Sequence, residues 1–366
     1  MKIAILGAGL SGLSCAKYLE DHGVEPVIFE KRHRVGERFP NMEAIIRLMH
    51  RPIDDPLTYL NKRYGLKLVP GGVMHTLEIH SPNHKASLKG KIIGYTTIRG
   101  HDERSLENQL SRHVRAGINF NSTVTWQELD KDFDRIVIAT GDPTITRELG
   151  IWQTDSEAFL KGCIVKGKFD TGLARIWLNT GLSKNCMVYF APFDTDEASY
   201  CTVAAPASPE ELDGLWSQTV EKLGFRPVQG TEFKYEEFKM GRALTRQFGK
   251  ILLVGAAGGF VEPFMGFGQV PSILSGLHAG EAIISGKDFN KLTAWFTRQY
   301  SYCLALRKFA DTLDNEGFDR LVSFIGAPLV TGIMTNTNFP LLGPAAGAVR
   351  SKNLLTHPFG QKNNAG

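Results

Sequence analysis

The chain has 366 residues, of which 42% are hydrophobic and 22% charged, and its formal net charge is +4. These values are ordinary for a globular protein with a large core, and the length favours two domains over one. So small a net charge does not indicate nucleic-acid binding. The five cysteines show neither metal-ligand spacing nor a disulfide pattern, and the first predicted strand begins at once without a leader, which together indicate a cytoplasmic location.

The first thirty residues predict a strand, a helix and a second strand. Residues 2–6 are a short apolar run, residues 10–23 carry apolar side chains near helical spacing, and residues 24–30 are again mainly apolar. Between the first strand and the helix lies GAGLSG, residues 7–12. It fits the GxGxxG motif of dinucleotide-binding proteins in the strand-to-helix context that the motif requires.

Each glycine of this motif has its own physical reason. Gly7 allows the tight turn, Gly9 lets the backbone approach a pyrophosphate, and Gly12 lets the helix pack closely on the strand. The N-terminus of the helix favours an anion. Glu30 ends the second strand 18 residues after Gly12, where a carboxylate can accept hydrogen bonds from a ribose. We therefore predict a dinucleotide site here.

Further along the chain the pattern changes twice. Short strands with an antiparallel pattern alternate with stretches of the dinucleotide-binding type, and residues 101–117 predict a charged amphipathic helix. The predicted fold class is α/β. It comprises a Rossmann-type cofactor domain built from residues 1–40, 95–150 and 245–290, an inserted, mainly antiparallel β-sheet substrate domain built from residues 41–94 and 151–244, and a helical C-terminal region, residues 291–366.

The segment GAAGGFVEPFMGFGQ, residues 255–269, carries five glycines and a single charge, as expected of a loop that turns its backbone toward a ligand. With other motifs it resembles the FAD-dependent geranylgeranyl reductase family, within the flavoprotein superfamily that has the p-hydroxybenzoate hydroxylase fold. The matching residues are Gly36 and Arg38 after Glu30, the ATG at residues 139–141, Arg99, Glu103, Arg104 and Leu106, and in the late loop Leu253, Gly255, Ala257, Gly258, Pro263, Gly266, Gly268, Ser275 and Gly276.

The resemblance implies that the cofactor is FAD. The residues expected to hold it are Gly7, Gly9, Leu10, Ser11, Gly12, Glu30, Lys31, Arg38, Arg99, Val124, Thr140, Gly141, Gly255, Ala256, Pro263, Gly266, Phe267 and Gly268. One position departs from the family, which has an aspartate where this chain has Ala256. Losing a charged acceptor costs about 1–3 kcal/mol, so we expect looser binding of FAD.

The resemblance further implies reduction of C=C bonds in an apolar, isoprenoid-type substrate by hydride from reduced flavin, with NAD(P)H or another donor supplying the electrons. Two alternatives stay open: a single-component monooxygenase that uses NAD(P)H and O₂, and a weakly flavinated, non-catalytic binding protein. A small apolar or aromatic substrate is expected, and the pocket candidates are Trp177, Tyr189, Phe190, Pro192 and Phe264. No residue stands out as a proton donor, and the spacing of the histidines does not indicate a metal site.

Residues 321–349 contain no charged side chain, but Pro328, Pro340 and Pro344 interrupt them. Such a segment is not a simple membrane-spanning helix. It can pack as a lid over the cavity, or it can make weak contact with a membrane surface, which would place the protein peripherally at the inner face of a membrane. The sequence does not predict an oligomeric state.

Overall fold

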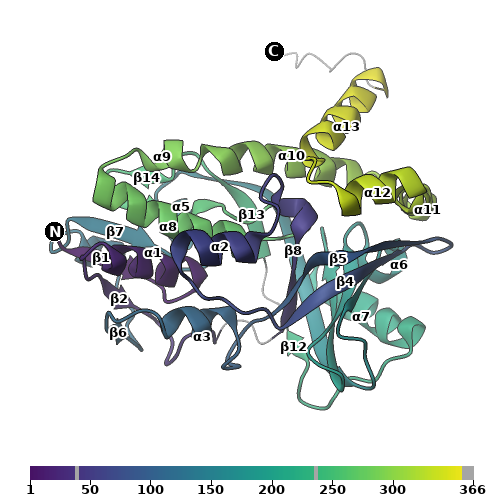
Figure 1. Ribbon diagram of the computed structural model, residues 1–366, viewed down its shortest axis with the longest axis horizontal. Helices are drawn as coiled ribbons and strands as arrows, with labels where there is room; N and C mark the ends of the chain where they lie inside the picture. Colours follow the sequence, from purple (N-terminus) through teal and green to yellow (C-terminus); the bar gives the residue numbers. More distant parts are fainter. Residues whose placement is uncertain (38–40, 235–237, 357–366) are drawn as a thin grey trace.

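Two β-sheets organise the described part of the chain, which the computed structural model gives for residues 1–37, 41–234 and 238–356. The first sheet has six strands, all parallel except for its edge strand β14. In spatial order they are β14 (Gln247–Phe248), β15 (Ile251–Leu253), β7 (Arg135–Ile138), β1 (Ile3–Leu6), β2 (Val27–Phe29) and β6 (Ile118–Asn119). This is the Rossmann-like unit, seen at the left of Figure 1.

Strand β1 explains why the first apolar run is continuous. Its alternate residues Ile3 and Ile5 belong to the core beneath α1 (Leu10–Asp21) and α8 (Gln269–Ser285), whereas Ala4 and Leu6 belong to the core on the other face. Since successive side chains of a strand point to opposite faces, a strand covered on both faces must be apolar throughout.

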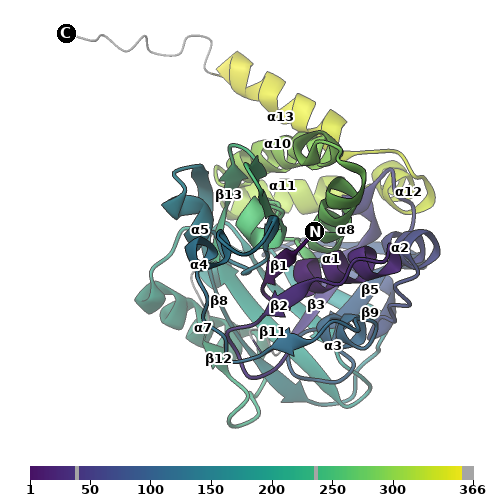
Figure 2. The ribbon, with the colours of Figure 1, turned by 90° about the vertical axis from the view of Figure 1, so that its left-hand side faces the viewer.

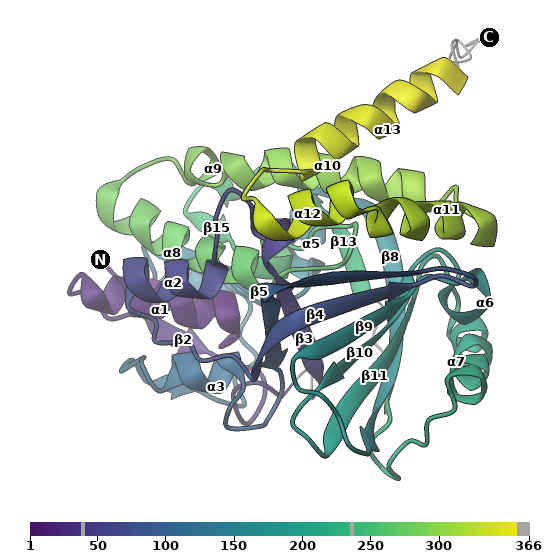
Figure 3. The ribbon, with the colours of Figure 1, turned by 45° about the vertical axis from the view of Figure 1, so that its right-hand side comes forward.

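The second sheet has nine strands and is antiparallel except where β4 pairs with β9. Its path is β12 (Phe233–Lys234), β8 (Trp152–Lys166), β11 (Glu197–Ala204), β10 (Met187–Pro192), β9 (Leu173–Trp177), β4 (Gly72–His80), β5 (Lys85–Ile98) and β3 (Met42–Ile46), and β13 (Phe238–Ala243) also pairs with β8. Figure 3 shows this sheet with α7 (Pro209–Leu223) beside it. The predicted fold class is confirmed.

The remaining helices connect the sheets or cover them. They are η1 (Arg47–His50), α2 (Pro56–Tyr64), α3 (Leu106–Ser111), α4 (Trp126–Leu129), α5 (Thr144–Glu148), α6 (Thr180–Ser183), η2 (Gly255–Gly258), α9 (Phe289–Leu292), α10 (Ala294–Ala310), α11 (Asn315–Gly326), α12 (Pro328–Asn336) and α13 (Leu342–Thr356). Helix α3 starts later than the helix predicted over residues 101–117, because Ser105 caps its start and Asp102 folds the preceding residues into a turn, and it ends earlier, at Ser111.

The C-terminal helices lie together at one end of the molecule. Helix α13 packs beside α10 and then points away from the body, as Figure 2 shows. Within the described residues, no helix alone combines the length and apolarity needed to cross a bilayer. Only α11 and α12 taken together do so, and a bend of 67° separates them.

Candidate functional site

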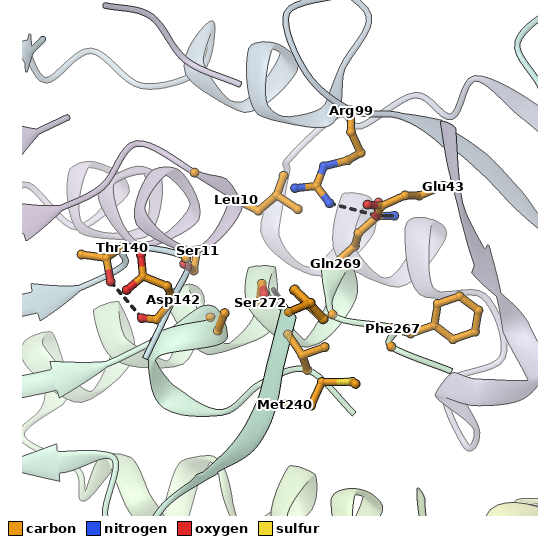
Figure 4. Close-up of a pocket in the computed structure, with 18 of the residues that line it drawn as sticks. Leu10, Ser11, Glu43, Arg99, Thr140, Asp142, Met240, Phe267, Gln269 and Ser272 are labelled. Carbon is orange, nitrogen blue, oxygen red and sulfur yellow. Dashed lines mark hydrogen bonds and ion pairs between the residues drawn. The ribbon is translucent and has the colours of Figure 1, made fainter. Parts of the chain in front are cut away.

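A cavity of about 620 Å³ lies between the Rossmann-like unit and the second sheet. Its walls come from the GxGxxG loop, the carboxyl ends of β1, β2 and β7, the loop between β15 and α8, and residues of β3, β4, β8, β9, β10, β11 and β13. Ligands of open α/β sheets bind at the carboxyl ends of the strands, so this is the expected position for a nucleotide cofactor. Figure 4 shows part of the wall.

The three motif glycines have three different surroundings. Gly7 has φ +111°, and an ideal Cβ on it would lie 2.3 Å from the Ala139 carbonyl oxygen. An ideal Cβ on Gly12 would lie 2.0 Å from the Gly7 carbonyl oxygen. A Cβ on Gly9, in contrast, would meet no atom of the described residues within 4 Å. Gly7 and Gly12 are therefore required by the protein itself, whereas Gly9 keeps a space in the cavity open to a ligand.

Glu30 is tied to the glycine loop. Its carboxylate accepts hydrogen bonds from the backbone N–H of Ala8, at 2.8 Å, and of Arg32, at 3.0 Å. These contacts fix the side chain at the cavity wall, next to Lys31 and on the same side as Val124. A carboxylate has about four acceptor sites, so two contacts leave capacity for ribose hydroxyls.

The loop after β15 meets the first loop directly. Gly255 has φ +56°, and its ideal Cβ would lie 2.6 Å from Ser11 Oγ. An ideal Cβ on Gly276 of α8 would lie 2.0 Å from the Ser11 carbonyl oxygen. The backbone N–H of Gly255 donates to Ser275 Oγ at 2.9 Å. Ala256 follows at the cavity wall, packed near Met240 and Val261.

Two buried charged residues, Glu262 and Arg246, form hydrogen bonds with the backbone of the loop between β15 and α8. Glu262 is 1% exposed, and its carboxylate accepts from the backbone N–H groups of Phe264 at 2.7 Å, Met265 at 3.0 Å and Phe267 at 3.0 Å. Burial raises the pKa of Glu262, and these N–H groups oppose that rise. Arg246 donates from Nε to the Gly258 carbonyl oxygen at 3.1 Å, and burial lowers its pKa to about 10.

An ionic cluster forms another part of the wall (Figure 4). Arg99 donates to Glu43 at 2.9 Å and to Glu107 at 2.6 Å, and Gln269 donates to Glu43 at 2.7 Å. Burial opposes the charge of Arg99, but Glu107 and Glu43 outweigh it and raise its pKa. The Oε2 atom of Glu107 is buried and has no hydrogen-bond partner in the described part of the chain.

The far end of the cavity is apolar. Its wall includes Ile46, Met74, Leu77, Ala174, Ile176, Met187 and Phe264. Tyr189 also lies there, its hydroxyl accepts from Asn41 Nδ2 at 3.2 Å, and burial raises its pKa well above the ordinary value. An apolar wall of this kind excludes water and suits an apolar ligand.

Most of the residues predicted to hold the cofactor lie at this cavity. Gly7, Gly9, Leu10, Ser11, Glu30, Lys31, Arg99, Val124, Thr140, Gly141, Gly255, Ala256, Pro263, Gly266, Phe267 and Gly268 line it. Gly12 lies behind the wall, against Gly7. Arg38 lies outside the described residues.

Only some of the residues predicted for the substrate pocket line the cavity. Tyr189, Phe190 and Phe264 contribute to the wall, but the ring of Phe190 packs on the opposite face of the sheet, with Tyr200. Trp177 stacks on His80 on that opposite face and does not line the cavity, and Pro192 does not line it either. Neighbouring residues of one strand face opposite sides, so Tyr189 and Phe190 could not both turn their rings inward.

The sequence did not predict that Glu43 and Glu107 line the cavity, or that Arg246 and Glu262 hold the loop after β15. Glu262 had one available signal, since it is the single charge in the segment 255–269. Among the described residues, no group of three or more histidine, cysteine, aspartate or glutamate side chains is arranged to hold a metal ion.

The residues present fit a dinucleotide: an open space over Gly9, a fixed carboxylate at Glu30 and a second backbone loop opposite. The fold is one that FAD-dependent oxidoreductases have. In fold, the chain is similar to a geranylgeranyl bacteriochlorophyll reductase-like protein of Thermoplasma acidophilum. The TM-score is 0.73 at 13% identity, over 95% of this chain and 98% of that one. The resemblance expected from the sequence motifs is confirmed at the level of the fold.

Other solved structures share this fold, and their names describe other reactions. The chain is similar to the flavin-dependent halogenase CmlS, with a TM-score of 0.61 at 15% identity over 97% of this chain and 78% of that one. It is also similar to 2-methyl-3-hydroxypyridine-5-carboxylic acid oxygenase, with a TM-score of 0.59 at 16% identity over 94% and 96%. Likeness at this identity shows the fold alone.

Sequence similarity is confined to short segments. Residues 5–60 match the family of NAD(P)-binding Rossmann-like domains. A stretch of 36 residues is 58% identical to 15-cis-phytoene desaturase of Synechococcus elongatus, which is 10% of this chain and 8% of the desaturase. The chain spans 11% or less of the length of the curated relatives that it matches.

Proposed function

We propose that this protein is an FAD-dependent reductase of C=C bonds in an apolar, isoprenoid-type substrate. The observation that carries the proposal is the apolar end of the cavity, which continues directly from the loop 255–268. The similarity to a reductase-like protein over 95% of the chain supports it. When bound, FAD would supply the hydride chemistry that side chains cannot provide.

The chain's own residues have two tasks in this proposal. The first is to hold the cofactor: Gly9 and the start of α1 at the pyrophosphate, Glu30 at the ribose, and the backbone from Gly255 to Gly268 at the flavin. Ala256 offers no carboxylate to the ribityl chain, so backbone groups must make those contacts.

The second task is to keep the reaction space dry. The apolar part of the wall consists of Ile46, Met74, Leu77, Ala174, Ile176 and Met187. The hydroxyl of Tyr189 is already engaged with Asn41, and Arg175 and Arg307 also contribute to the lining. Exclusion of water strengthens the remaining polar interactions and protects a reactive reduced cofactor. A proton must also reach the second carbon of the double bond.

NAD(P)H is the proposed electron donor. The chain carries one GxGxxG motif, at residues 7–12. A nicotinamide nucleotide would therefore reach the flavin from the surface of the same cavity.

A single-component monooxygenase is the second candidate, favoured by the similarity to an oxygenase over 94% of the chain. One experiment separates the two. The FAD-loaded protein is reduced by NAD(P)H, or by dithionite if NAD(P)H fails, and is given an isoprenoid alkene without O₂. Conversion to a product with two more hydrogens supports the reductase. Reaction only in air, with substrate-stimulated O₂ uptake and an oxygenated product, would overturn it.

A further inference from the structure

Helices α11 and α12 form a bent unit at the surface, which we call the α11–α12 elbow (residues 315–336). Phe324 is 62% exposed and Leu329 76%, and Phe339 in the following loop is 51% exposed. Helix α12, PLVTGIMTN, has no buried residue although it is mainly apolar. The other strongly exposed large apolar side chains of the described residues are scattered: Met1, Val27, Val69, Phe120, Leu244 and Phe248.

Polar contacts fix the elbow to the body of the protein from its inner side. Asp319 accepts from Ser81 Oγ at 2.6 Å and from Asn83 Nδ2 at 2.8 Å. Arg51 donates to the carbonyl oxygens of Met334, at 2.6 Å, and Phe339, at 3.1 Å. Because these contacts hold both helices, the fold itself sets the outward position of Phe324 and Leu329.

The inner side of the elbow also joins the cavity. Ile325 and Met334 pack against the apolar cluster that contains Ile46, Met74 and Leu77, and these three residues line the cavity. Figure 3 shows α11 and α12 lying across β4 and β5. One apolar layer therefore separates the reaction space from an exposed apolar surface.

From this arrangement we propose that the elbow is the surface on which the protein rests on a lipid bilayer, from which an apolar substrate would enter. The entry of substrate rests on the proposed function, whereas the contact with lipid does not. The helices have 12 and 9 residues, too short to span a bilayer of about 30 Å and suited to lying in its interface.

Charge favours a bilayer over a protein partner. Protein interfaces surround an apolar centre with a polar rim, but from residue 321 to residue 349 the chain has no charged side chain, and Arg51, which contacts this segment from the turn after η1, is a cation that suits an anionic headgroup. The nearest charges along the chain are Arg320, which forms a 3.5 Å pair with exposed Glu316, and Arg350. Asp319 is turned inward. Apolar contact should therefore supply most of the affinity, with a small additional gain from anionic headgroups.

The test uses the full chain loaded with FAD and no substrate. Flotation measures binding to phosphatidylcholine vesicles, with and without phosphatidylglycerol. Wild type should float. The double variant F324S/L329S should bind at least about tenfold more weakly, because serine replaces two apolar side chains that would be buried in the lipid interface. The matched control V69S/L244S changes side chains of similar exposure, 64% and 70%, outside the elbow and should float as wild type does.

Several results would overturn the proposal. Wild type could stay in solution with both lipids, or F324S/L329S could bind as wild type does. Wild type could also form a dimer that F324S/L329S abolishes, without binding vesicles, which would make the elbow a contact between two chains. Unchanged circular dichroism and FAD absorbance would exclude misfolding of the variant. A protein that floats but reduces no alkene would overturn the proposed function alone.

Discussion

Gly255 lies against Ser11, so closely that an ideal Cβ on Gly255 would come within 2.6 Å of Ser11 Oγ. The contact joins the two glycine loops, which are far apart in the sequence. One loop begins α1 and the other precedes α8, and these helices pack along each other where Gly276 meets the Ser11 carbonyl. A dinucleotide that lies across both loops is therefore held by backbone from two segments at once.

Gly9 and Gly12 should respond differently to the same substitution. Gly9→Ala should leave stability within about 0.5 kcal/mol of wild type, since its Cβ meets open space, and should weaken FAD binding about tenfold or more, since the pyrophosphate needs that space. Gly12→Ala should destabilise the fold by about 1–3 kcal/mol or more, because its Cβ would collide with the Gly7 carbonyl. Urea unfolding and FAD titration measure both effects. Equal losses of stability in the two variants would contradict the assignment.

Ala256→Asp should tighten FAD binding, by up to about tenfold to a hundredfold, because it restores a charged acceptor beside the cofactor. Ala256→Asn is the control of similar size, and it should gain less because its amide is neutral. Fluorescence quenching of FAD on titration gives both affinities. If the aspartate variant folds but no longer binds FAD, the flavin does not lie against residue 256 as we propose.

Glu262→Gln should loosen the second loop. The Glu262 carboxylate has two oxygens that accept hydrogen bonds from three backbone N–H groups, whereas a neutral amide has only one acceptor oxygen. A buried N–H donor that is left unpaired costs about 1–3 kcal/mol. We expect weaker FAD binding and a changed flavin absorption spectrum. Glu316→Gln is the control, because Glu316 is exposed at the surface. An unchanged affinity and spectrum in Glu262→Gln would show that the loop does not depend on this carboxylate.

Glu78 should contribute to stability in a pH-dependent way. Burial alone would raise its pKa, but hydrogen bonds from Lys85 and Arg175 outweigh burial and lower the pKa from 4.5 to about 2. A lowered pKa gives stability that is present above the unfolded value and is lost as the pH falls through the folded value. Wild type should therefore exceed Glu78→Gln in stability at neutral pH, and the difference should shrink between pH 4.5 and about 2.

Urea unfolding of the two proteins at pH 7 and at about pH 3 measures that difference. Glu157→Gln serves as the control, since Glu157 is exposed on β8. A difference between wild type and Glu78→Gln that stays constant with pH would mean that the ion pairs of Glu78 do not stabilise the fold.

The two glycine loops at the cavity were predictable because their constraints are local. A tight turn, a close helix and an open backbone each require glycine at a fixed place, so residues 7–12 and 255–268 carry the signal in the sequence itself. The strands of the Rossmann-like unit were equally clear, since β1 is covered on both faces and is apolar throughout.

The substrate end was not predictable in the same way. Whether Tyr189 or Phe190 faces the cavity depends on which face α7 covers, and alternation alone does not decide that. Arg99 was predicted to lie at the site and lines the cavity, but its partners Glu43 and Glu107 come from β3 and α3 and have no common spacing in the sequence. The helix predicted over residues 101–117 begins only at Leu106, because the side chains of Asp102 and Ser105 compete with helical hydrogen bonds.

The absorbance spectrum of the purified protein, after incubation with FAD and removal of the excess, tests the cofactor site most directly. Wild type should retain about one flavin per chain, with a band near 450 nm that bleaches on reduction and a much weaker band in Gly9→Ala. A wild-type protein that is folded by circular dichroism but retains no flavin would contradict the assignment of this cavity and would favour a non-catalytic binding protein.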